Sequence, residues 1–289
     1  MKYILVYGGG NAGQRHAKIL QELGHEVLIT DLLSEKPEES VGRWINLNDV
    51  QQNPQHIEGV VVATPPGTHW GIAQPYIDRG IPVFIEKPGG LNAFDHFNPQ
   101  LVAVGFQLRA IPALRALCVR ARQCDHAYVY DHQDMSTWPQ ATYQRDLLTE
   151  FSHEVDLACW FFGPIYAVKA QYLTATWLQV QLSALDGRHV TISLNSRHQG
   201  YARGISLTDG LEQELWTFTK EENEQAYKDQ LVAWLNGTPF CTVRTVRHTH
   251  AVLGTIQQSL ESKNCWCFVP TRHSSLAGYE EESRRPDGS

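Results

Sequence analysis

The sequence is poor in the features that mark membrane proteins and nucleic-acid-binding proteins. No apolar run approaches the length that spans a bilayer, hydrophobic residues make up 42% of the 289-residue chain, and 19% are charged. Lys and Arg are scattered and fewer than Asp and Glu, 24 against 31, which leaves a net charge of −7 and no basic stripe for a phosphate backbone. These shortages predict a soluble globular protein with neither a membrane nor a nucleic acid as partner.

The six cysteines are accompanied neither by a secretion signal, which would favour disulfides, nor by a second pair of zinc ligands. The opening run MKYILVYGGGNAG passes from a short apolar stretch straight into glycines, unlike a signal peptide with its small-residue cleavage site. We therefore expect a cytoplasmic protein with free thiols. Cys265 and Cys267 have no second Cys or His pair at zinc-ligand spacing, so no metal site is expected.

Length and patterning predict two domains. A chain of 289 residues exceeds the usual size of one domain. Residues 1–108 alternate short apolar runs with helical patterns, which predicts an α/β domain with a doubly wound, mostly parallel sheet. Residues 109–270 begin with a helix and continue as strands that alternate apolar and polar residues, which predicts an α+β domain with a mostly antiparallel sheet covered on one face. Residues 271–289 hold too little apolar content to pack and are expected to form a flexible tail.

The periodicity assigns most elements directly. Strands are predicted over residues 2–8, 25–31, 59–66, 81–88, 101–107, 127–135, 166–175, 177–185, 189–197 and 202–210. Helices are predicted over residues 11–24, 68–80, 109–124, 221–237 and 245–262, and a further helix holds the segment TEFSHEVD and covers the second sheet.

A glycine loop with the spacing of a dinucleotide site follows the first predicted strand. Gly8, Gly10 and Gly13 permit a tight turn, a close approach of a pyrophosphate and close packing of helix on strand, and Asn11 and Ala12 open the helix. Asp31 ends the next strand, where its carboxylate can accept hydrogen bonds from an adenosine ribose and repel a 2′-phosphate. Leu32 and Leu33 provide no Arg for such a phosphate, so NAD is favoured over NADP. The alternative is a glycine turn kept for packing.

The segment TEFSHEVD places an acid, a histidine and an acid three residues apart. On a helix Glu150 would lie beside His153, and His153 beside Asp156, at the edge of an apolar stripe. The spacing alone also fits a helix whose polar flank carries ordinary solvated charges.

Three stretches in the same order resemble a known family. VYGGGNAGQRHAKIL, VVVATPPGTHWGIAQPYIDRGIPVFIEKP and the histidine segment closing in FFG resemble the glucose-fructose oxidoreductase and inositol dehydrogenase family, called Gfo/Idh/MocA. The resemblance extends to about Pro270. It implies an N-terminal Rossmann domain and a C-terminal domain whose open sheet mediates homo-oligomers. It also implies reversible hydride transfer between a nicotinamide cofactor and a sugar, cyclitol or related secondary alcohol.

The resemblance also implies roles for single residues. Thr64, Pro65 and His69 would border the cofactor, and Glu86 and Lys87 match the family's Glu-Lys-Pro motif, whose lysine projects toward substrate and nicotinamide. His153 and Asp156 match the family's histidine-to-aspartate segment. The residues expected to contact substrate are Arg109, Asp156 and, just before the histidine helix, Tyr143 and Arg145, which could equally be a surface pair.

Two departures from the family pattern concern the substrate loop. Many members have an aspartate where this chain has Thr149, preceded by a glycine cluster that is missing here. Glu150 instead resembles a subgroup with the pattern acid-x-Ser-His-Glu-x-Asp, which is linked to nonulosonic acid and surface-sugar pathways. The resemblance therefore leaves the substrate open.

The chemistry implied by the resemblance needs a base, because removing hydride from a secondary alcohol also requires removing the hydroxyl proton. His153 would be that base, with Glu150 holding its tautomer and Lys87 stabilising alkoxide charge. Two alternatives remain: a sensor of the same fold that binds dinucleotide and sugar without turnover, and a nicotinamide-dependent glycosidase-like or epimerising enzyme.

Overall fold

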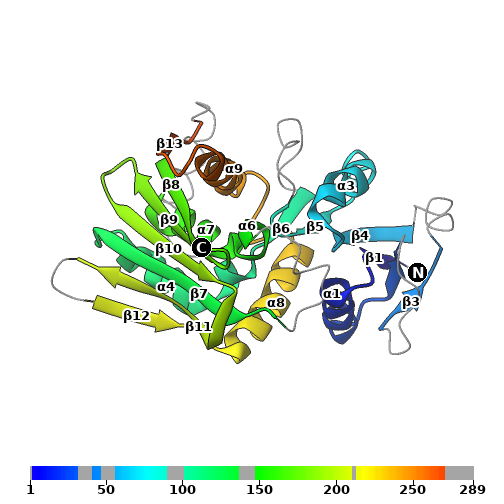
Figure 1. Ribbon diagram of the computed structural model, residues 1–289. Coiled ribbons are helices and arrows are strands. Elements are labelled where there is room, and N and C mark those ends of the chain that lie inside the picture. The colour runs from blue at the N-terminus through cyan, green and yellow to red at the C-terminus, as the bar shows by residue number, and fades with distance from the viewer. Residues whose placement is uncertain are drawn as a thin grey trace. The chain divides into compact units, whose positions relative to one another are not determined.

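The computed structural model describes residues 2–31, 41–46, 56–89, 101–136, 147–209 and 213–270. Their contacts divide the chain into two compact units (Figure 1). Unit 1 runs to residue 107 and also holds residues 225–243, and unit 2 holds residues 108–224 and those from 244 on. Each unit contains one β-sheet. Within the described ranges no helix is both long and apolar enough to cross a membrane.

Unit 1 contains a six-stranded sheet in the order β3-β2-β1-β4-β5-β6, with every neighbouring pair parallel. The strands are β1 Tyr3–Tyr7, β2 Val27–Thr30, β3 Arg43–Trp44, β4 Ile57–Val62, β5 Val83–Glu86 and β6 Val102–Gly105. Helix α1 (Asn11–Glu22) follows β1, and the turn η2 (Pro66–Thr68) leads from β4 into α3 (His69–Ile77). The strand order reverses between β1 and β4, where sheets of this kind bind ligands beyond the strands' carboxyl ends. The predicted doubly wound parallel sheet is confirmed.

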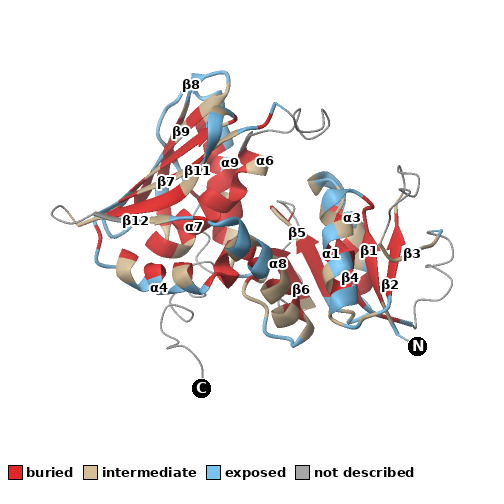
Figure 2. Ribbon diagram, turned by 90° about the horizontal axis from the view of Figure 1, so that it is seen from below, coloured by how far each residue is buried: buried red, intermediate tan, exposed pale blue. Residues whose placement is uncertain are grey.

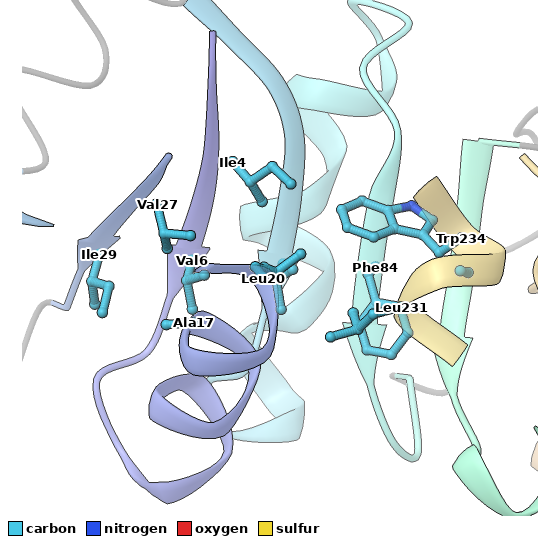
Figure 3. Close-up of a cluster of buried hydrophobic side chains, with 11 residues drawn as sticks. Ile4, Val6, Ala17, Leu20, Val27, Ile29, Phe84, Leu231 and Trp234 are labelled. Atoms are coloured by element: carbon cyan, nitrogen blue, oxygen red, sulfur yellow. The ribbon is translucent and has the colours of Figure 1, made fainter. Parts of the chain in front are cut away.

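Apolar runs buried on both faces form the core of unit 1 (Figure 3). Ile4 and Val6 of β1 are fully buried, as is Leu20 on the helix that covers them. Continuous Val, Ile and Leu in β1, β2 and β4 are typical of parallel strands covered on both sides. The same pattern made these strands readable from the sequence.

Helix α8 (Lys220–Leu235) begins in unit 2 and returns the chain to unit 1. Its Leu231 and Trp234 are buried in the core of unit 1 with Phe84 (Figure 3). Gly59 of β4 makes room for this packing, since a Cβ there would lie 3.0 Å from the Trp234 ring. The sequence pattern assigned residues 225–243 to the second domain, whereas this apolar packing holds them in unit 1.

Unit 2 contains a seven-stranded sheet in the order β12-β11-β7-β10-β9-β8-β13. The strands are β7 His126–Asp134, β8 Ile165–Thr174, β9 Trp177–Ala184, β10 His189–Asn195, β11 Arg197–Thr208, β12 Gln213–Thr217 and β13 Cys267–Phe268. Strands β7 and β10 are parallel, and the other neighbouring pairs are antiparallel. The mostly antiparallel sheet predicted from the alternating pattern is confirmed.

The helices of unit 2 cover one face of this sheet. They are α4 Pro112–Ala121, α6 Leu147–Glu150, α7 Ser152–Phe162 and α9 Arg247–Glu261, preceded by the turn η5 Gln107–Ala110. Helix α7 packs against β7 and β10, and α9 packs against β8. Figure 2 shows the result, with α7 and α9 largely buried. Val129, Val180 and Ile192 point into this covered face, and their strand neighbours point the other way.

The predicted helix through TEFSHEVD is broken at Phe151. Helix α6 ends at Glu150 and α7 begins at Ser152, with Phe151 at φ −97° and ψ 23° between them. Phe151 is 1% exposed, so its packing in the core holds a backbone angle that helical periodicity does not reveal. Glu150 and His153 therefore lie on separate helices. The short strands β3, β12 and β13 were not predicted either.

Candidate active site

The glycine loop after β1 has the shape that a pyrophosphate requires. Gly8 has φ +101°, and a Cβ there would lie 2.5 Å from the carbonyl oxygen of Ala63. A Cβ at Gly13 would overlap the carbonyl oxygen of Gly8, so this glycine lets α1 pack directly on the loop. At Gly10, by contrast, a Cβ would meet nothing within 4 Å among the described atoms. Two glycines thus serve packing, and the middle one borders open space.

That open space lies at the N-terminus of α1. Gly10 is the N-cap, and in the described part of the chain no side chain caps the helix and no acidic residue lies in its first turn. The first N–H groups of a helix have no partner within the helix, so this end can hold an anion. Asp31 reaches the same loop, because the Gly9 N–H donates to its Oδ2 at 2.6 Å. Leu32 and Leu33 lie outside the described residues.

The loop after β4 is held by its own side chains. Thr68 Oγ1 contacts Thr64 Oγ1 at 2.8 Å and donates to the carbonyl of Pro65 at 2.7 Å. His69 is fully buried, and its Nε2 donates to the carbonyl of Thr64 at 2.6 Å. Thr64 and Pro65 follow β4 at the sheet's reversal point, and their contact with the cofactor stays a prediction. His69, which the resemblance placed beside the cofactor, braces the loop from within.

The Glu-Lys-Pro segment follows β5. The Lys87 N–H donates to Glu86 Oε2 at 3.0 Å, and His16 of α1 contacts Glu86 Oε1 at 2.6 Å. Burial alone would raise the pKa of Glu86, but the hydrogen bond and charge of His16, together with Lys87, hold that pKa below its ordinary value. Glu86 is therefore a carboxylate, and His16 Nε2 is the donor. His16 was not predicted as a site residue, although it follows Gly13 by three positions on the same helix.

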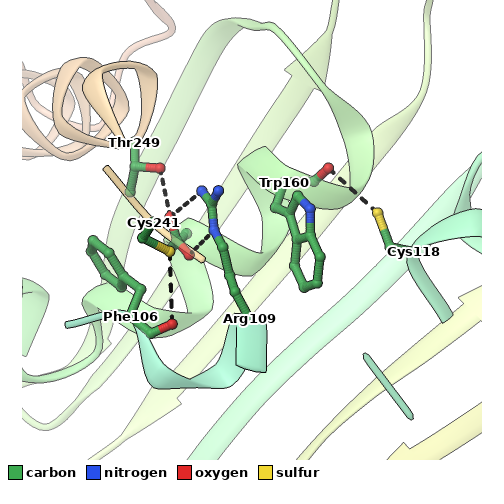
Figure 4. A network of polar contacts seen from close by, with 7 residues as sticks. Phe106, Arg109, Cys118, Trp160, Cys241 and Thr249 are labelled. Carbon is green, nitrogen blue, oxygen red and sulfur yellow. Dashed lines mark hydrogen bonds and ion pairs between the residues drawn. The ribbon is translucent and has the colours of Figure 1, made fainter. Parts of the chain in front are cut away.

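Arg109 and Asp156 of unit 2 bind each other, in a network for which Figure 4 labels Arg109 and Thr249. Arg109 Nε donates to Asp156 Oδ2 at 2.9 Å, and its terminal nitrogen donates to Oδ1 at 2.7 Å. Thr249 of α9 also donates to Oδ1, at 2.9 Å. The side chains of the pair are 5% and 1% exposed. Both residues were expected to contact substrate, and the structure places them in a buried ion pair that ties η5, α7 and α9 together.

A second buried ion cluster was missed by the sequence analysis. Arg203 of β11 donates to Glu154 Oε1 from two nitrogens, at 2.8 and 2.6 Å, and lies 3.2 Å from Asp131. Its guanidinium packs on the ring of Phe218. The two carboxylates raise the pKa of Arg203, although burial opposes them. The cluster fastens the start of α7 to the sheet, so it positions the neighbouring His153.

His153 itself lies in the first turn of α7 and is 6% exposed. Glu150 ends α6 and is partly exposed. Tyr143 and Arg145, predicted as substrate contacts, lie outside the described residues. Among the residues that are described, no group of three or more His, Cys, Asp or Glu could hold a metal ion.

His248 and His250 lie in the first turn of α9 and are buried, at 7% and 5% exposed. The Ile165 N–H donates to His248 Nε2 at 2.8 Å. Burial lowers the pKa of His248 to about 4, which keeps the ring neutral and able to accept this bond. His248 therefore joins α9 to the first residue of β8.

Comparison with known families agrees with the geometry of unit 1. Residues 2–98 match the family model GFO_IDH_MocA, described as an oxidoreductase family with an NAD-binding Rossmann fold. This segment, less than half of the chain, is thus similar to the Gfo/Idh/MocA family. The resemblance inferred from the motifs is thereby confirmed, and so is NAD as the cofactor that this family's domain binds.

Solved structures share the fold of nearly the whole chain. A myo-inositol dehydrogenase from Corynebacterium glutamicum has a TM-score of 0.78 at 18% identity, with 94% of this chain and 100% of that chain covered. The enzyme from Lactobacillus casei, solved with NAD(H) and myo-inositol, has a TM-score of 0.77 at 15% identity, with 94% and 98% covered. The WlbA dehydrogenase from Thermus thermophilus, solved with NAD and UDP-GlcNAcA, has a TM-score of 0.71 at 18% identity, with 89% and 95% covered. Comparison with curated protein sequences gives no match.

Proposed function

We propose that the protein is an NAD-dependent oxidoreductase that transfers hydride between nicotinamide and a secondary alcohol or ketone of a sugar, sugar derivative or cyclitol. The observation that carries the proposal is the glycine loop, where open space at Gly10 meets the uncapped N-terminus of α1 beside Asp31. The myo-inositol and UDP-GlcNAcA bound by proteins of the same fold support the substrate class. We further propose the cytoplasm as its compartment, where the six cysteines, all of them among the described residues, would stay free thiols.

The proposed chemistry divides among three side chains. Nicotinamide supplies the redox step by accepting or donating hydride. His153 takes the hydroxyl proton during oxidation and returns it during reduction. Lys87 donates a hydrogen bond to the same oxygen and stabilises its developing charge, and Glu150 holds the His153 tautomer.

The substrate contacts proposed from the resemblance need one revision. Arg109 and Asp156 bind each other in a buried pair, so we assign them the support of α7 in place of contact with substrate. Tyr143 and Arg145, which precede α6, remain the proposed contacts for an anionic or hydroxyl-rich substrate group.

A sensor that binds dinucleotide and sugar without turnover is the second candidate. One observation favours the sensor. Asp156, the aspartate of the histidine segment, already accepts hydrogen bonds from Arg109 and Thr249. Turnover of any sugar, sugar nucleotide or cyclitol by the wild-type protein excludes it.

NADH is expected to bind at least about tenfold more tightly than NADPH, because the Asp31 carboxylate would face a 2′-phosphate of like charge. Quenching or enhancement of nicotinamide fluorescence during titration measures both affinities. Asp31→Ser should narrow the difference, whereas the control Asp78→Ser, on the exposed end of α3, should keep it. Equal affinities in the wild type would mean that Asp31 does not face the ribose.

We also propose a homo-oligomer formed through the outer face of the unit 2 sheet. This face has an uncharged centre, where Tyr128 and Tyr130 of β7 stack at 5.7 Å beside Thr191 and Ser193 of β10. Gly204 of β11 leaves room for the Tyr130 phenol, which a Cβ there would approach to 2.7 Å. One helix layer covers only the other face, so a second copy is the partner that matches this surface.

Light scattering at micromolar concentration is expected to give a multiple of the 32.7 kDa chain mass. Thr191→Lys would put a charge at the centre of the outer face and should lower the measured mass. Val119→Lys, at an exposed position of α4, is the matched control and should leave it unchanged. A clean monomer mass for the wild type would end this proposal.

A further inference from the structure

His16 joins the two loops of unit 1 that carry the proposed cofactor and catalytic residues. It lies on α1, the helix that begins at the glycine loop, and its Nε2 donates to Glu86 Oε1 at 2.6 Å. The other oxygen of Glu86 accepts the Lys87 N–H at 3.0 Å. An unbroken chain of hydrogen bonds thus leads from α1 through one carboxylate to the backbone of Lys87.

The His16 ring packs against aromatic side chains. Its ring is fully buried, edge-on to Phe84 at 5.2 Å and to Tyr227 at 6.2 Å between ring centres. Its Nδ1 has no hydrogen-bond partner among the described residues. The charged and titratable groups around it are Glu86, Lys87 beyond it, Tyr227, and Arg15, whose guanidinium lies over the Tyr227 ring. The contact of Nε2 with Glu86 is the one polar contact of this ring among the described residues.

The packing on either side fixes the geometry of this contact. Gly13 allows α1 to sit directly on the glycine loop, where a Cβ at this position would overlap the carbonyl oxygen of Gly8. Gly105 pairs with Glu86 across the sheet, and a Cβ at Gly105 would lie 3.4 Å from the Glu86 Cα. The donor and the acceptor are therefore held by close backbone packing at both ends.

We propose that His16 is a positioning residue that orients Lys87 for catalysis through Glu86, and that it couples the dinucleotide loop to the Glu-Lys-Pro segment. The inference rests on the proposed function for the role of Lys87 alone. Without the His16 donor, the nearly buried Glu86 carboxylate loses its strongest partner. Glu86 is then no longer an anion and no longer holds the backbone of Lys87 in place. The nicotinamide-side lysine would then sample positions away from the reacting oxygen.

The first test needs no substrate. Nitrogen-15 NMR of the imidazole in the wild-type protein should show His16 protonated at Nε2. Carbon-13 NMR, assigned with Glu86→Gln, should show the Glu86 carboxyl titrating at higher pH in His16→Met than in the wild type. His16→Gln places an amide donor near the Nε2 position and should restore the wild-type titration. His25→Met removes a partly exposed histidine that contacts Glu58 in the same unit, and it serves as the control.

The second test follows Lys87. Its side-chain carbon-13 signal, assigned with Lys87→Met, should move in His16→Met and return in His16→Gln. With a substrate in hand, His16→Met should lower kcat by roughly 10- to 100-fold with little change in KM or NADH affinity. His16→Gln should recover most of that loss, which a purely structural role of the imidazole ring would not allow.

Three results would overturn the inference: a wild-type His16 whose proton is on Nδ1, a Glu86 titration that His16→Met leaves in place, or a Lys87 signal and kcat that stay at wild-type values in that variant. Absence of turnover in the wild type would count against the proposed function, while the Glu86 and Lys87 signals would still decide the coupling.

Discussion

Replacing His153 with Asn is expected to lower turnover by about 10²- to 10⁴-fold while NADH binding survives. Asn keeps approximate shape and hydrogen bonding but cannot take a proton near neutral pH. Because His153 is buried in the first turn of α7, the smaller amide fits without new exposure of the core. The measurement is absorbance of reduced cofactor with a library of sugars, sugar nucleotides, nonulosonic acids and cyclitols, in both directions.

Lys87→Met is expected to lower turnover as well, by the roughly 2.7–4 kcal/mol that an oxyanion donor contributes at such sites. NADH affinity should change little, because the pyrophosphate is assigned to the glycine loop and not to Lys87. The matched control is Lys18→Met on the exposed side of α1. A variant of Lys87 or His153 that keeps the wild-type rate would refute the role given to that residue, and a wild type that binds ligands but converts none would favour the sensor.

Asp156→Ala is expected to destabilise the protein by about 3–5 kcal/mol, because it leaves the Arg109 guanidinium buried without its carboxylate. Thr249 loses its acceptor at the same time. Urea unfolding, followed by tryptophan fluorescence, measures the loss. Replacing both partners with apolar residues, Arg109→Met with Asp156→Leu, should recover part of it, since no unpaired charge remains.

The ion pair of Asp186 and Arg188, in which the carboxylate is exposed and Arg188 also donates to backbone carbonyls, provides the comparison. Asp186 is 52% exposed, so Asp186→Ala should change the free energy of unfolding by less than about 1 kcal/mol. The two variants test the assignment of Asp156 directly. An Asp156→Ala protein that unfolds like the wild type but shows a raised KM would mean that Asp156 contacts substrate, as the family resemblance implied.

The sequence allowed good prediction of what local patterns encode. The β1 strand, the glycine loop and α1 lie within one short stretch, where strand period, glycine spacing and helix period coincide. The alternating strands β7 to β11 were readable for the same reason, because each carries its own pattern of covered and uncovered faces.

The pairings between distant residues could not be predicted in this way. Arg109 and Asp156 are 47 residues apart, and Glu154 and Arg203 are 49 apart, so no periodicity links either pair. A charged residue in a helical pattern is predicted to lie on the solvent-exposed side of the helix. Only the tertiary structure shows that Asp156 and Glu154 face buried arginines. The break at Phe151 has the same origin, since packing and not helix propensity sets its backbone.

The return of α8 to unit 1 has a consequence for folding during synthesis. The ribosome has already made strands β7 to β12 when residues 225–243 emerge, so Leu231 and Trp234 reach the apolar site beside Phe84 only after the sheet of unit 2 is available. Until then the apolar site beside Phe84 lacks the side chains of Leu231 and Trp234. Synthesis of the NAD-binding unit therefore begins first and ends late. Bound cofactor can stabilise this unit only after both of its segments, residues 1–107 and 225–243, have been synthesised.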